Sequence, residues 1–319
     1  MEVSFLIVGT PRSGTTLVQR LACELPGVAM PPETHFFSSG YADGVVARGG
    51  FPLHEPRFDE ELDAYAVAYE SWAGRKPVLD ARRLKAIIGG SCGSITELFA
   101  AIVGGLAPSG SILGEKTPDH IRWWRPISRA MPNVKFVFVV RDPRAVVESI
   151  LRMPWGSDSH VVLAERWRWD QRCALAARRT LGQGRCLQVR YEDVVRDPER
   201  SRRVLASFLG TGEADVADGR DHEHIDGFVL PWETWKEQAL TSVTTEKVEI
   251  WRVALPTEVS LDVAAICRGQ MKRFGYEIPG NAAWAHGRLA RLEPTLRKRR
   301  RRIRRRMRDK QREIDAVEF

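Results

Sequence analysis

Short apolar runs that alternate with helical patterns organise this sequence. Residues 3–8 (VSFLIV) are almost all apolar and stop at Gly9, which is typical of a strand buried on both faces of a parallel sheet. Apolar side chains then recur at helical spacing between Thr15 and Glu24. The residues between these two patterns favour a turn. The start of the sequence therefore predicts a strand, a loop and a helix in succession.

The same succession recurs twice. Residues 134–140 (VKFVFVV) predict a second buried strand, and a helix with Asp142 as N-cap and Pro143 at its first position follows it. A third strand is expected at residues 185–190, with a helix after Asp197-Pro198. The sequence also predicts helices within residues 40–111 and an amphipathic helix at 259–274. Strands that alternate with helices predict an α/β fold of the P-loop type, with a central parallel sheet in a three-layer α/β/α arrangement.

Charge is concentrated near one end of the chain. The formal net charge is +8, but residues 294–312 alone hold twelve Arg or Lys against one Asp, and the last seven residues hold three acids. The remainder of the sequence therefore carries no net charge. We expect one domain at residues 1–280 and an Arg-rich C-terminal extension at 281–319, which forms either a solvated charged helix or a disordered segment.

Cysteine usage and hydropathy favour a cytoplasmic protein. The five cysteines are scattered and form no CxxC pair, so neither a disulfide framework nor a zinc site is predicted. No apolar stretch approaches the ~20 residues of a membrane span, and no apolar run follows a basic leader. We therefore expect a reducing compartment and no metal.

The loop at residues 9–16 (GTPRSGTT) is a candidate anion site. A loop between a buried strand and a helix directs backbone N–H groups and the positive end of the helix dipole at one spot. The nucleoside triphosphate version of such a loop requires a lysine where this chain has Thr15. Its absence argues against a P-loop kinase or NTPase, the main alternative enzyme class, while Arg12 supplies positive charge from inside the loop.

The segment from Pro11 to Leu17 (PRSGTTL) resembles the 5′-phosphosulfate loop of sulfotransferases that use 3′-phosphoadenosine-5′-phosphosulfate (PAPS). Arg141 at a strand end, with Ser149 in the next helix, resembles the 3′-phosphate site of that family. Two shorter segments also match: GEKTP at 114–118 resembles a segment of bacterial members, and Tyr191-Glu192 resembles a strand end that borders the nucleotide. The resemblance spans roughly residues 3–277, in the family's order.

The resemblance implies a PAPS-dependent enzyme that sulfates a hydroxyl group on a glycan, glycolipid, small molecule or peptide, as glycan and tyrosylprotein sulfotransferases do. The residues implied to bind the donor are Pro11, Arg12, Ser13, Gly14, Thr15, Thr16, Arg141, Ser149, Tyr191 and Lys247, the last within a late loop at 241–252. Sulfuryl transfer needs positioning and charge stabilisation rather than a metal. Arg12 is the candidate cation beside the leaving phosphate, and Lys116 is expected near the transferred group or the acceptor.

A base must remove the proton of the acceptor hydroxyl, and two candidates lie in residues 32–37 (PETHFF). Glu33 is preferred, because the stretch resembles the Glu-x-His-Phe-Phe segment of glycan sulfotransferases, in which the glutamate is the base. Neighbouring aromatic rings are also expected to raise the pKa of this carboxyl towards a useful value. His35 remains the alternative base.

The basic extension allows a further partner. Its twelve cations could hold an anionic membrane surface at residues 294–312, so the protein is expected in the cytoplasm, peripheral to a membrane. Nucleic acid would be attracted only non-specifically. A membrane or nucleic-acid adaptor with an inert α/β body is the alternative from another class. Acceptor identity and oligomeric state are not predicted.

Overall fold

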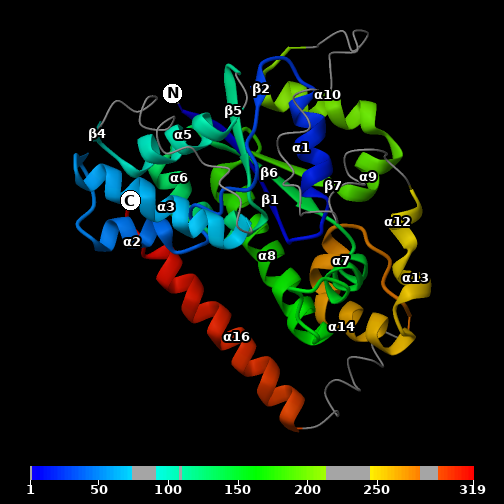
Figure 1. The fold of residues 1–319 in the computed structure, drawn as a ribbon. Coiled ribbons are helices and arrows are strands. Elements are labelled where there is room, and N and C mark those ends of the chain that lie inside the picture. Colours follow the sequence, from blue (N-terminus) through cyan, green and yellow to red (C-terminus); the bar gives the residue numbers. More distant parts are fainter. Residues whose placement is uncertain (1, 74–90, 108–109, 213–244, 281–293) are drawn as a thin grey trace.

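A parallel sheet of five strands forms the centre of the molecule (Figure 1). The computed structural model describes residues 2–73, 91–107, 110–212, 245–280 and 294–319. The strand order in the sheet is β2-β5-β1-β6-β7. The strands of this sheet are β1 (Val3–Gly9), β2 (Val28–Ala29), β5 (Ile112–Lys116), β6 (Lys135–Val140) and β7 (Cys186–Arg190). A separate antiparallel pair consists of β3 (Leu53–His54) and β4 (Ser91–Cys92).

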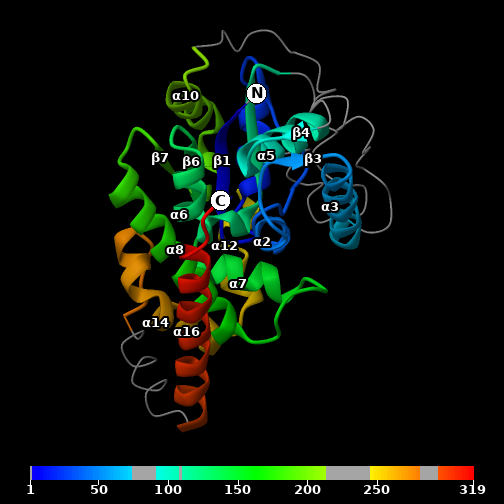
Figure 2. The ribbon, with the colours of Figure 1, turned by 90° about the vertical axis from the view of Figure 1, so that its left-hand side faces the viewer.

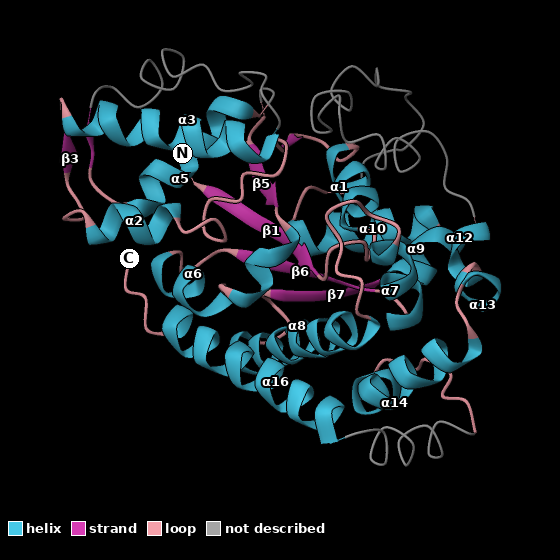
Figure 3. Cartoon of the chain, turned by 60° about the horizontal axis from the view of Figure 1, so that its bottom comes forward, coloured by secondary structure: helices cyan, strands magenta, loops and turns pink. Residues whose placement is uncertain are grey.

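Helices surround this sheet (Figure 3). They are α1 (Thr15–Cys23), α2 (Tyr41–Ala47), α3 (Arg57–Ala73), α5 (Ile95–Leu106), the 3-10 helix η1 (Pro118–Arg122), α6 (Trp124–Ala130), α7 (Pro143–Leu151), α8 (His160–Leu181), α9 (Tyr191–Arg196), α10 (Pro198–Leu209), α12 (Glu246–Glu249), α13 (Trp251–Ala254), α14 (Thr257–Arg273) and α16 (Pro294–Asp315).

The three-layer arrangement follows from the alternation of side chains along the central strands. Phe5 and Ile7 of β1 pack in one buried cluster with residues of α1, α9 and α10, whereas Leu6 and Val8 pack in another with residues of α3, α5, α6 and α8. Successive side chains of a strand point to opposite faces, so an uninterrupted apolar run buries both faces. The predicted α/β/α class and its parallel sheet are confirmed.

The N-cap predicted at Asp142 is present, and Asp197 caps α10 in the same way. The carboxylate of Asp142 accepts a hydrogen bond from the backbone N–H of Arg144 at 2.9 Å, and Asp197 accepts one from Arg200 at 2.9 Å. Proline follows each of these caps at the first helical position, where its missing N–H leaves no intrahelical bond unmade. These short motifs fix where α7 and α10 begin.

The register of the strands aligns their carboxyl ends. Ile7 of β1 pairs with Lys116 of β5, Gly9 pairs with Val139 of β6, and Val140 pairs with Arg190 of β7. All four strands run in the same direction. The residues that follow β1, β5, β6 and β7 therefore meet at one edge of the sheet, where ligands of such folds usually bind.

The basic extension forms a helix that packs against the body. Helix α16 lies along α8 in Figures 1 and 2, with its C-terminal end beside α6. The guanidinium of Arg304 donates to Glu165 of α8 at 2.8 Å, and that carboxylate is only 1% exposed. Near the end of the chain, Phe319 stacks on Trp123 with ring centroids 6.3 Å apart. One face of the helix is therefore docked rather than solvated.

Of the two alternatives predicted for the extension, the helix is present in the described residues, but one of its faces is docked rather than solvated. From position 300 onwards, the side chains of α16 that are buried or half-buried recur at positions 300, 303, 304, 307, 311, 314 and 315. This spacing of three and four residues is that of a helix face. The expected domain boundary at 280/281 adjoins residues 281–293, which lie outside the described residues, and it stays a prediction.

No helix in the described ranges is both long and apolar enough to cross a bilayer.

Candidate active site

The loop between β1 and α1 has a backbone that only certain residues can adopt. Gly14 has φ 96° and Arg12 has φ 70°, both in the left-handed region. A Cβ atom on Gly14 would lie 2.3 Å from the ring of Tyr191, so the glycine also allows this tyrosine to pack beneath the loop. The Ser13 side chain and backbone N–H both donate to the carbonyl of Thr10 and close the turn. The loop is therefore held in one shape.

Helix α1 begins directly after this loop. Gly14 is its N-cap and has no side chain that could bond to the N–H groups of the first turn. Thr15 and Thr16, both buried, are the first two helical residues. The N–H groups of a first turn have no partner inside the helix and carry partial positive charge, which suits an anion. The predicted phosphosulfate loop has the geometry of an anion cradle.

Arg141 and Ser149 reach the same loop from β6 and α7. The guanidinium of Arg141 donates from Nη1 to the backbone carbonyl of Arg12 at 3.2 Å. The Nε of Arg12 donates to the hydroxyl of Ser149 at 3.1 Å. The sequence suggested two separated cationic pockets, but these contacts join them into one continuous site. The ring of Tyr191 completes it, lying 4.3 Å from the guanidinium carbon of Arg141.

Two more cations, Lys247 and Arg152, border this site. The backbone carbonyl of Lys247 accepts a hydrogen bond from Nη2 of Arg141 at 2.6 Å, so Lys247 lies beside the pair as expected. Burial, with the charges of Arg12, Arg141 and Arg152 added, lowers the pKa of Lys247. Burial, and then Arg141, likewise lower the pKa of Arg12. Cations that disfavour one another's charge in this way create a site suited to a polyanion. Residues 241–244 of the predicted late loop lie outside the described residues.

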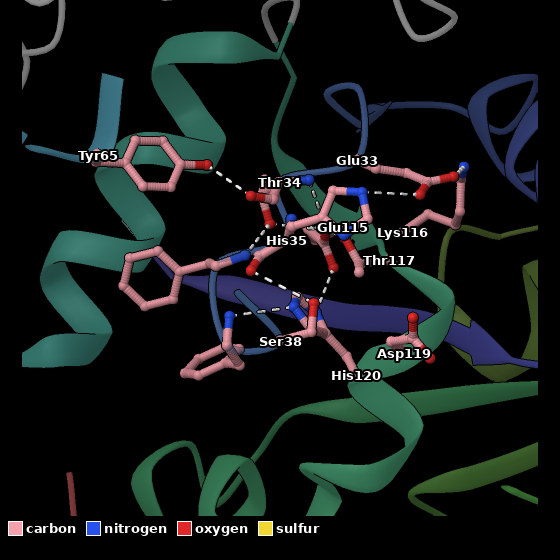
Figure 4. A network of polar contacts seen from close by, with 12 residues as sticks. Glu33, Thr34, His35, Ser38, Tyr65, Glu115, Lys116, Thr117, Asp119 and His120 are labelled. Carbon is pink, nitrogen blue, oxygen red and sulfur yellow. Dashed lines mark hydrogen bonds and ion pairs between the residues drawn. The ribbon is translucent and has the colours of Figure 1, made fainter. Parts of the chain in front are cut away.

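The candidate base lies at the end of β5 (Figure 4). Glu33 forms an ion pair through Oε1 with Nζ of Lys116, which is fully buried. Its other oxygen, Oε2, lies 3.3 Å from Nε2 of His35. The charge of Glu33 also acts on Arg12, whose pKa it raises against the larger effect of burial. The four predicted catalytic residues, Glu33, Arg12, Lys116 and His35, are therefore brought together.

His35 is tied to Glu33 electrostatically. Burial alone would lower the pKa of the imidazole, but the hydrogen bond and the charge of Glu33 outweigh it, with smaller contributions from Asp119 and Glu115, and the pKa is raised. An imidazole with a raised pKa is a weaker candidate for a neutral base at pH 7 than a carboxylate. The choice between Glu33 and His35 as the base stays a prediction.

The two aromatic residues that follow Glu33 and His35 in the sequence pack in the hydrophobic core, and the expected effect of aromatic rings on Glu33 stays a prediction. Phe36 and Phe37 are fully buried and pack on Phe99, with ring centroids 5.0 and 4.8 Å apart. The Glu33 carboxylate contacts Lys116 and His35. A dipeptide of two aromatic residues within a loop serves the core here, because that is where their apolar surface is buried.

Some residues of the site were not predicted from the sequence. Arg152, the C-cap residue of α7, follows Ser149 by three positions, a spacing that places both on one helix face and could have revealed it. Gln171 of α8 donates to the hydroxyl of Thr10 at 3.3 Å, and nothing in its local sequence signals this contact. Within the described ranges, no group of three or more His, Cys, Asp or Glu side chains could hold a metal ion.

Comparisons with known proteins agree with this geometry. The sequence model of the Sulfotransferase family matches residues 4–215. Protein-tyrosine sulfotransferase 2 of Gallus gallus is 27% identical over 281 residues, which are 85% of this chain and 68% of that protein. Carbohydrate sulfotransferase 3 of Mus musculus is 28% identical over 170 residues, which are 47% of this chain and 35% of that protein.

Solved structures show a similar fold. The sulfotransferase domain from the Synechococcus PCC 7002 olefin synthase has a TM-score of 0.58 and 23% identity, covering 87% of this chain and 95% of its own. The sulfotransferase domain from the curacin biosynthetic pathway has a TM-score of 0.56 and 20% identity, covering 88% of this chain and 99% of its own. Both likenesses concern the arrangement of the α/β body.

Proposed function

The chain belongs to the sulfotransferase family, and from that premise we propose that it transfers the sulfuryl group of PAPS to a hydroxyl group of its acceptor. One observation carries the donor assignment: the loop residue Arg12 is joined to both Arg141 and Ser149 by hydrogen bonds, directly before α1 begins. PAPS has a phosphosulfate and a separate phosphate on one adenosine. A glycine-bearing loop and a second cation with a hydroxyl suit these two groups.

The residues present fit such a donor on two grounds. In the described part of the chain, the buried Nε of Arg141 has no hydrogen-bond partner, which leaves a donor available beside the loop. The lowered pKa values of Arg12 and Lys247 are relieved by an anion between them. When bound, PAPS supplies an activated sulfuryl group and a phosphate leaving group.

We propose the following roles for the side chains. The phosphosulfate is held by Thr15, Thr16 and the loop residues Pro11 to Gly14. The remainder of the nucleotide is held by Arg141, Ser149, Tyr191 and Lys247. Arg12 stabilises negative charge that develops on the leaving phosphate, and Lys116 does so near the transferred group. Glu33 takes the proton of the acceptor hydroxyl, with His35 as the alternative base. No metal takes part.

The acceptor is proposed to be a phenolic or sugar hydroxyl. The names of the protein-tyrosine and carbohydrate sulfotransferases that are similar to this chain indicate that those proteins act on such groups. A P-loop kinase or NTPase is disfavoured because Thr15 stands where those enzymes need a lysine. An adaptor with an inert body is disfavoured because the polar site is assembled.

A thermal-shift comparison tests the donor. A ligand that binds only the folded state raises the melting temperature. We expect 3′,5′-adenosine bisphosphate to raise it, and ATP with Mg²⁺ to raise it much less. Arg141→Ala is expected to abolish most of the shift, whereas Arg172→Ala, on the surface of α8, should preserve it. Stabilisation by ATP with Mg²⁺ alone would overturn the proposed function.

The outer face of α16 supports a second, separate proposal about location. Arg301, Arg305, Arg308 and Arg312 are all exposed, and their spacing of three and four residues places them on one stripe of the helix. We propose that this face holds the enzyme against an anionic membrane surface from the cytoplasmic side, since each cation near such a surface contributes about 1 kcal/mol.

A further inference from the structure

We propose that Glu115, Thr117 and His120 position the candidate base, by holding the backbone of the loop that carries Glu33. This inference rests on the proposed function, because it assigns these residues a role in placing Glu33. All three side chains are fully buried at the end of β5 and in η1, beneath the loop (Figure 4). The hydrogen bonds through which we propose that they act end on the loop backbone and the Thr34 hydroxyl rather than on Glu33, so they would act as positioning residues.

Glu115 is the centre of the network. Its Oε1 accepts hydrogen bonds from the backbone N–H of Thr34 at 3.2 Å and from the Thr34 hydroxyl at 2.9 Å. The same oxygen accepts from the Thr117 hydroxyl at 2.5 Å, and Oε2 lies 3.0 Å from Nδ1 of His120. Burial raises the pKa of this carboxyl, but His120, Thr117 and Thr34 outweigh burial and lower it. Glu115 is therefore a buried carboxylate whose hydrogen bonds hold the loop.

Thr117 and His120 hold the next part of the loop. The Thr117 hydroxyl oxygen accepts from the backbone N–H of His35 at 3.1 Å, and Nε2 of His120 accepts from the N–H of Phe37 at 3.2 Å. Because Nε2 must accept, the proton of the neutral imidazole lies on Nδ1 and is donated to Glu115. The N–H groups of residues 34, 35 and 37 thus all end on side chains of a single segment, residues 115–120.

The loop needs this support because its backbone is unusual. His35 has φ 51°, which is unfavourable for a residue with a Cβ atom and persists where surrounding contacts determine it. Its carbonyl also accepts from the N–H of Ser39 at 2.9 Å. The turn directs His35 back towards Glu33. Without the hydrogen bond that its backbone N–H donates to Thr117, residue 35 would prefer an extended or right-handed helical conformation.

Strand β5, whose end holds the loop, also carries the lysine that pairs with Glu33. Lys116 lies between Glu115 and Thr117 and forms the ion pair with Glu33. Since successive residues of β5 point to opposite faces, one strand end holds the loop backbone with Glu115 and the Glu33 carboxylate with Lys116. A shift of the loop would therefore move Glu33 relative to both Lys116 and Arg12.

A pair of variants at Thr117 tests this role. Thr117→Val keeps the shape of the side chain but removes the acceptor for His35, whereas Thr117→Ser keeps the hydroxyl. We expect Thr117→Val to lower kcat at least about 10-fold, as misplaced catalytic groups do, and Thr117→Ser to stay within about twofold of the wild type. The KM for PAPS should not change in either variant. The assay uses radiolabelled PAPS with a tyrosine peptide or an oligosaccharide, whichever the wild type sulfates.

Two further measurements separate positioning from a general loss of structure. Amide hydrogen exchange of His35 should become faster in Thr117→Val, while that of Phe37, held by His120, should change less. The acidic limb of the pH dependence of kcat should also move, because the surroundings of Glu33 change. As a matched control, Glu61→Gln neutralises a buried carboxylate of α3 that pairs with Arg48, and should leave kcat and the acidic limb unaltered.

The outcomes are distinguishable. Equal kcat values for Thr117→Val and the wild type, or an equal loss in Thr117→Ser and Thr117→Val, would overturn the positioning role while leaving the proposed function intact. A wild-type protein that neither binds 3′,5′-adenosine bisphosphate nor transfers a sulfuryl group would overturn the proposed function and this inference together.

Discussion

At the scale of single residues, the candidate site combines opposite charges that form ion pairs with like charges that repel one another. Glu33 is held by Lys116 and His35, which are cationic or can become so, whereas Arg12 faces the like charge of Arg141. The carboxylate is thereby oriented, and the arginines are left with charge that an anion would offset. A donor and a base can share one edge of the sheet because the two environments differ in this way.

Removing the carboxylate of Glu33 tests its role. Glu33→Gln keeps the size of the side chain but cannot take a proton, so kcat should fall by about 10²–10⁴, the usual contribution of a general base. The affinity for 3′,5′-adenosine bisphosphate should remain within about threefold, because Glu33 is not a proposed donor ligand. Calorimetry and steady-state assays measure the two effects. Full activity in Glu33→Gln, with loss in His35→Gln, would transfer the role of base to His35.

The raised pKa of His35 predicts a dependence of stability on pH. The folded value lies above the ordinary value of 6.5, so the protonated imidazole stabilises the fold fully below pH 6.5. This stabilisation is lost as pH rises through the folded pKa. Compared with His35→Asn, the wild type should have its largest advantage in melting temperature near pH 5.5 and a smaller one at pH 8. An advantage that grows with pH would show that the pKa is lowered instead.

At the scale of elements, α8 links the basic helix to the donor site. On one side, Glu165 receives Arg300 and Arg304 of α16, at 2.9 and 2.8 Å. On the other, the indole N–H of Trp167 donates to the carbonyl of Arg141 at 3.0 Å, and Gln171 donates to Thr10. Since Glu165 is buried, its charge depends on these arginines, which lower its pKa against the effect of burial.

The docking of α16 is therefore expected to contribute to stability. The double substitution Arg300→Ala and Arg304→Ala leaves the buried Glu165 with fewer partners and should destabilise the protein by about 2–4 kcal/mol, measured by urea unfolding. The control Arg302→Ala and Arg306→Ala removes the same number of charges from exposed positions and should change stability by less than about 0.5 kcal/mol. Equal effects of the two double variants would show that only total charge matters.

At the scale of the whole molecule, the excess of positive charge lies in a different part of the chain from the candidate site. The cations beyond residue 293 account for the excess of positive charge, and in α16 one helix face docks while the other is exposed. A balanced body with a one-sided cationic helix has a defined orientation towards an anionic surface. The candidate site lies at the carboxyl edge of the sheet, formed by other residues.

Vesicle binding tests this orientation. Replacing Arg301, Arg305, Arg308 and Arg312 with Gln removes four exposed cations, which at about 1 kcal/mol each should weaken binding to phosphatidylserine vesicles about 10²–10³-fold. Turnover in the absence of vesicles should stay unchanged, and binding should weaken as salt rises. If the variant binds vesicles as tightly as the wild type, the membrane proposal fails, and tighter binding to duplex DNA than to vesicles would favour nucleic acid.

Much of the body was predictable, because its signals are local. The apolar runs before Gly9 and Arg141, the proline-marked helix starts and the loop glycines each act through neighbours in sequence, and all appear where predicted. The role of Phe36 and Phe37 was not predictable in this way. Whether an aromatic pair lines a site or fills the core depends on Phe99, which is distant in sequence.

The sequence by itself determined strands β1, β6 and β7 and the candidate anion-binding loop, because backbone preference and apolar periodicity operate over a few residues. Only the tertiary structure decided that Arg12 meets Ser149, that Lys116 reaches Glu33 and that residues 115–120 hold the loop of Glu33. These contacts depend on strand order and register, which bring distant segments to one edge of the sheet. The docking of α16 also depends on the tertiary structure, because its arginines pair with a buried carboxylate of another helix, Glu165.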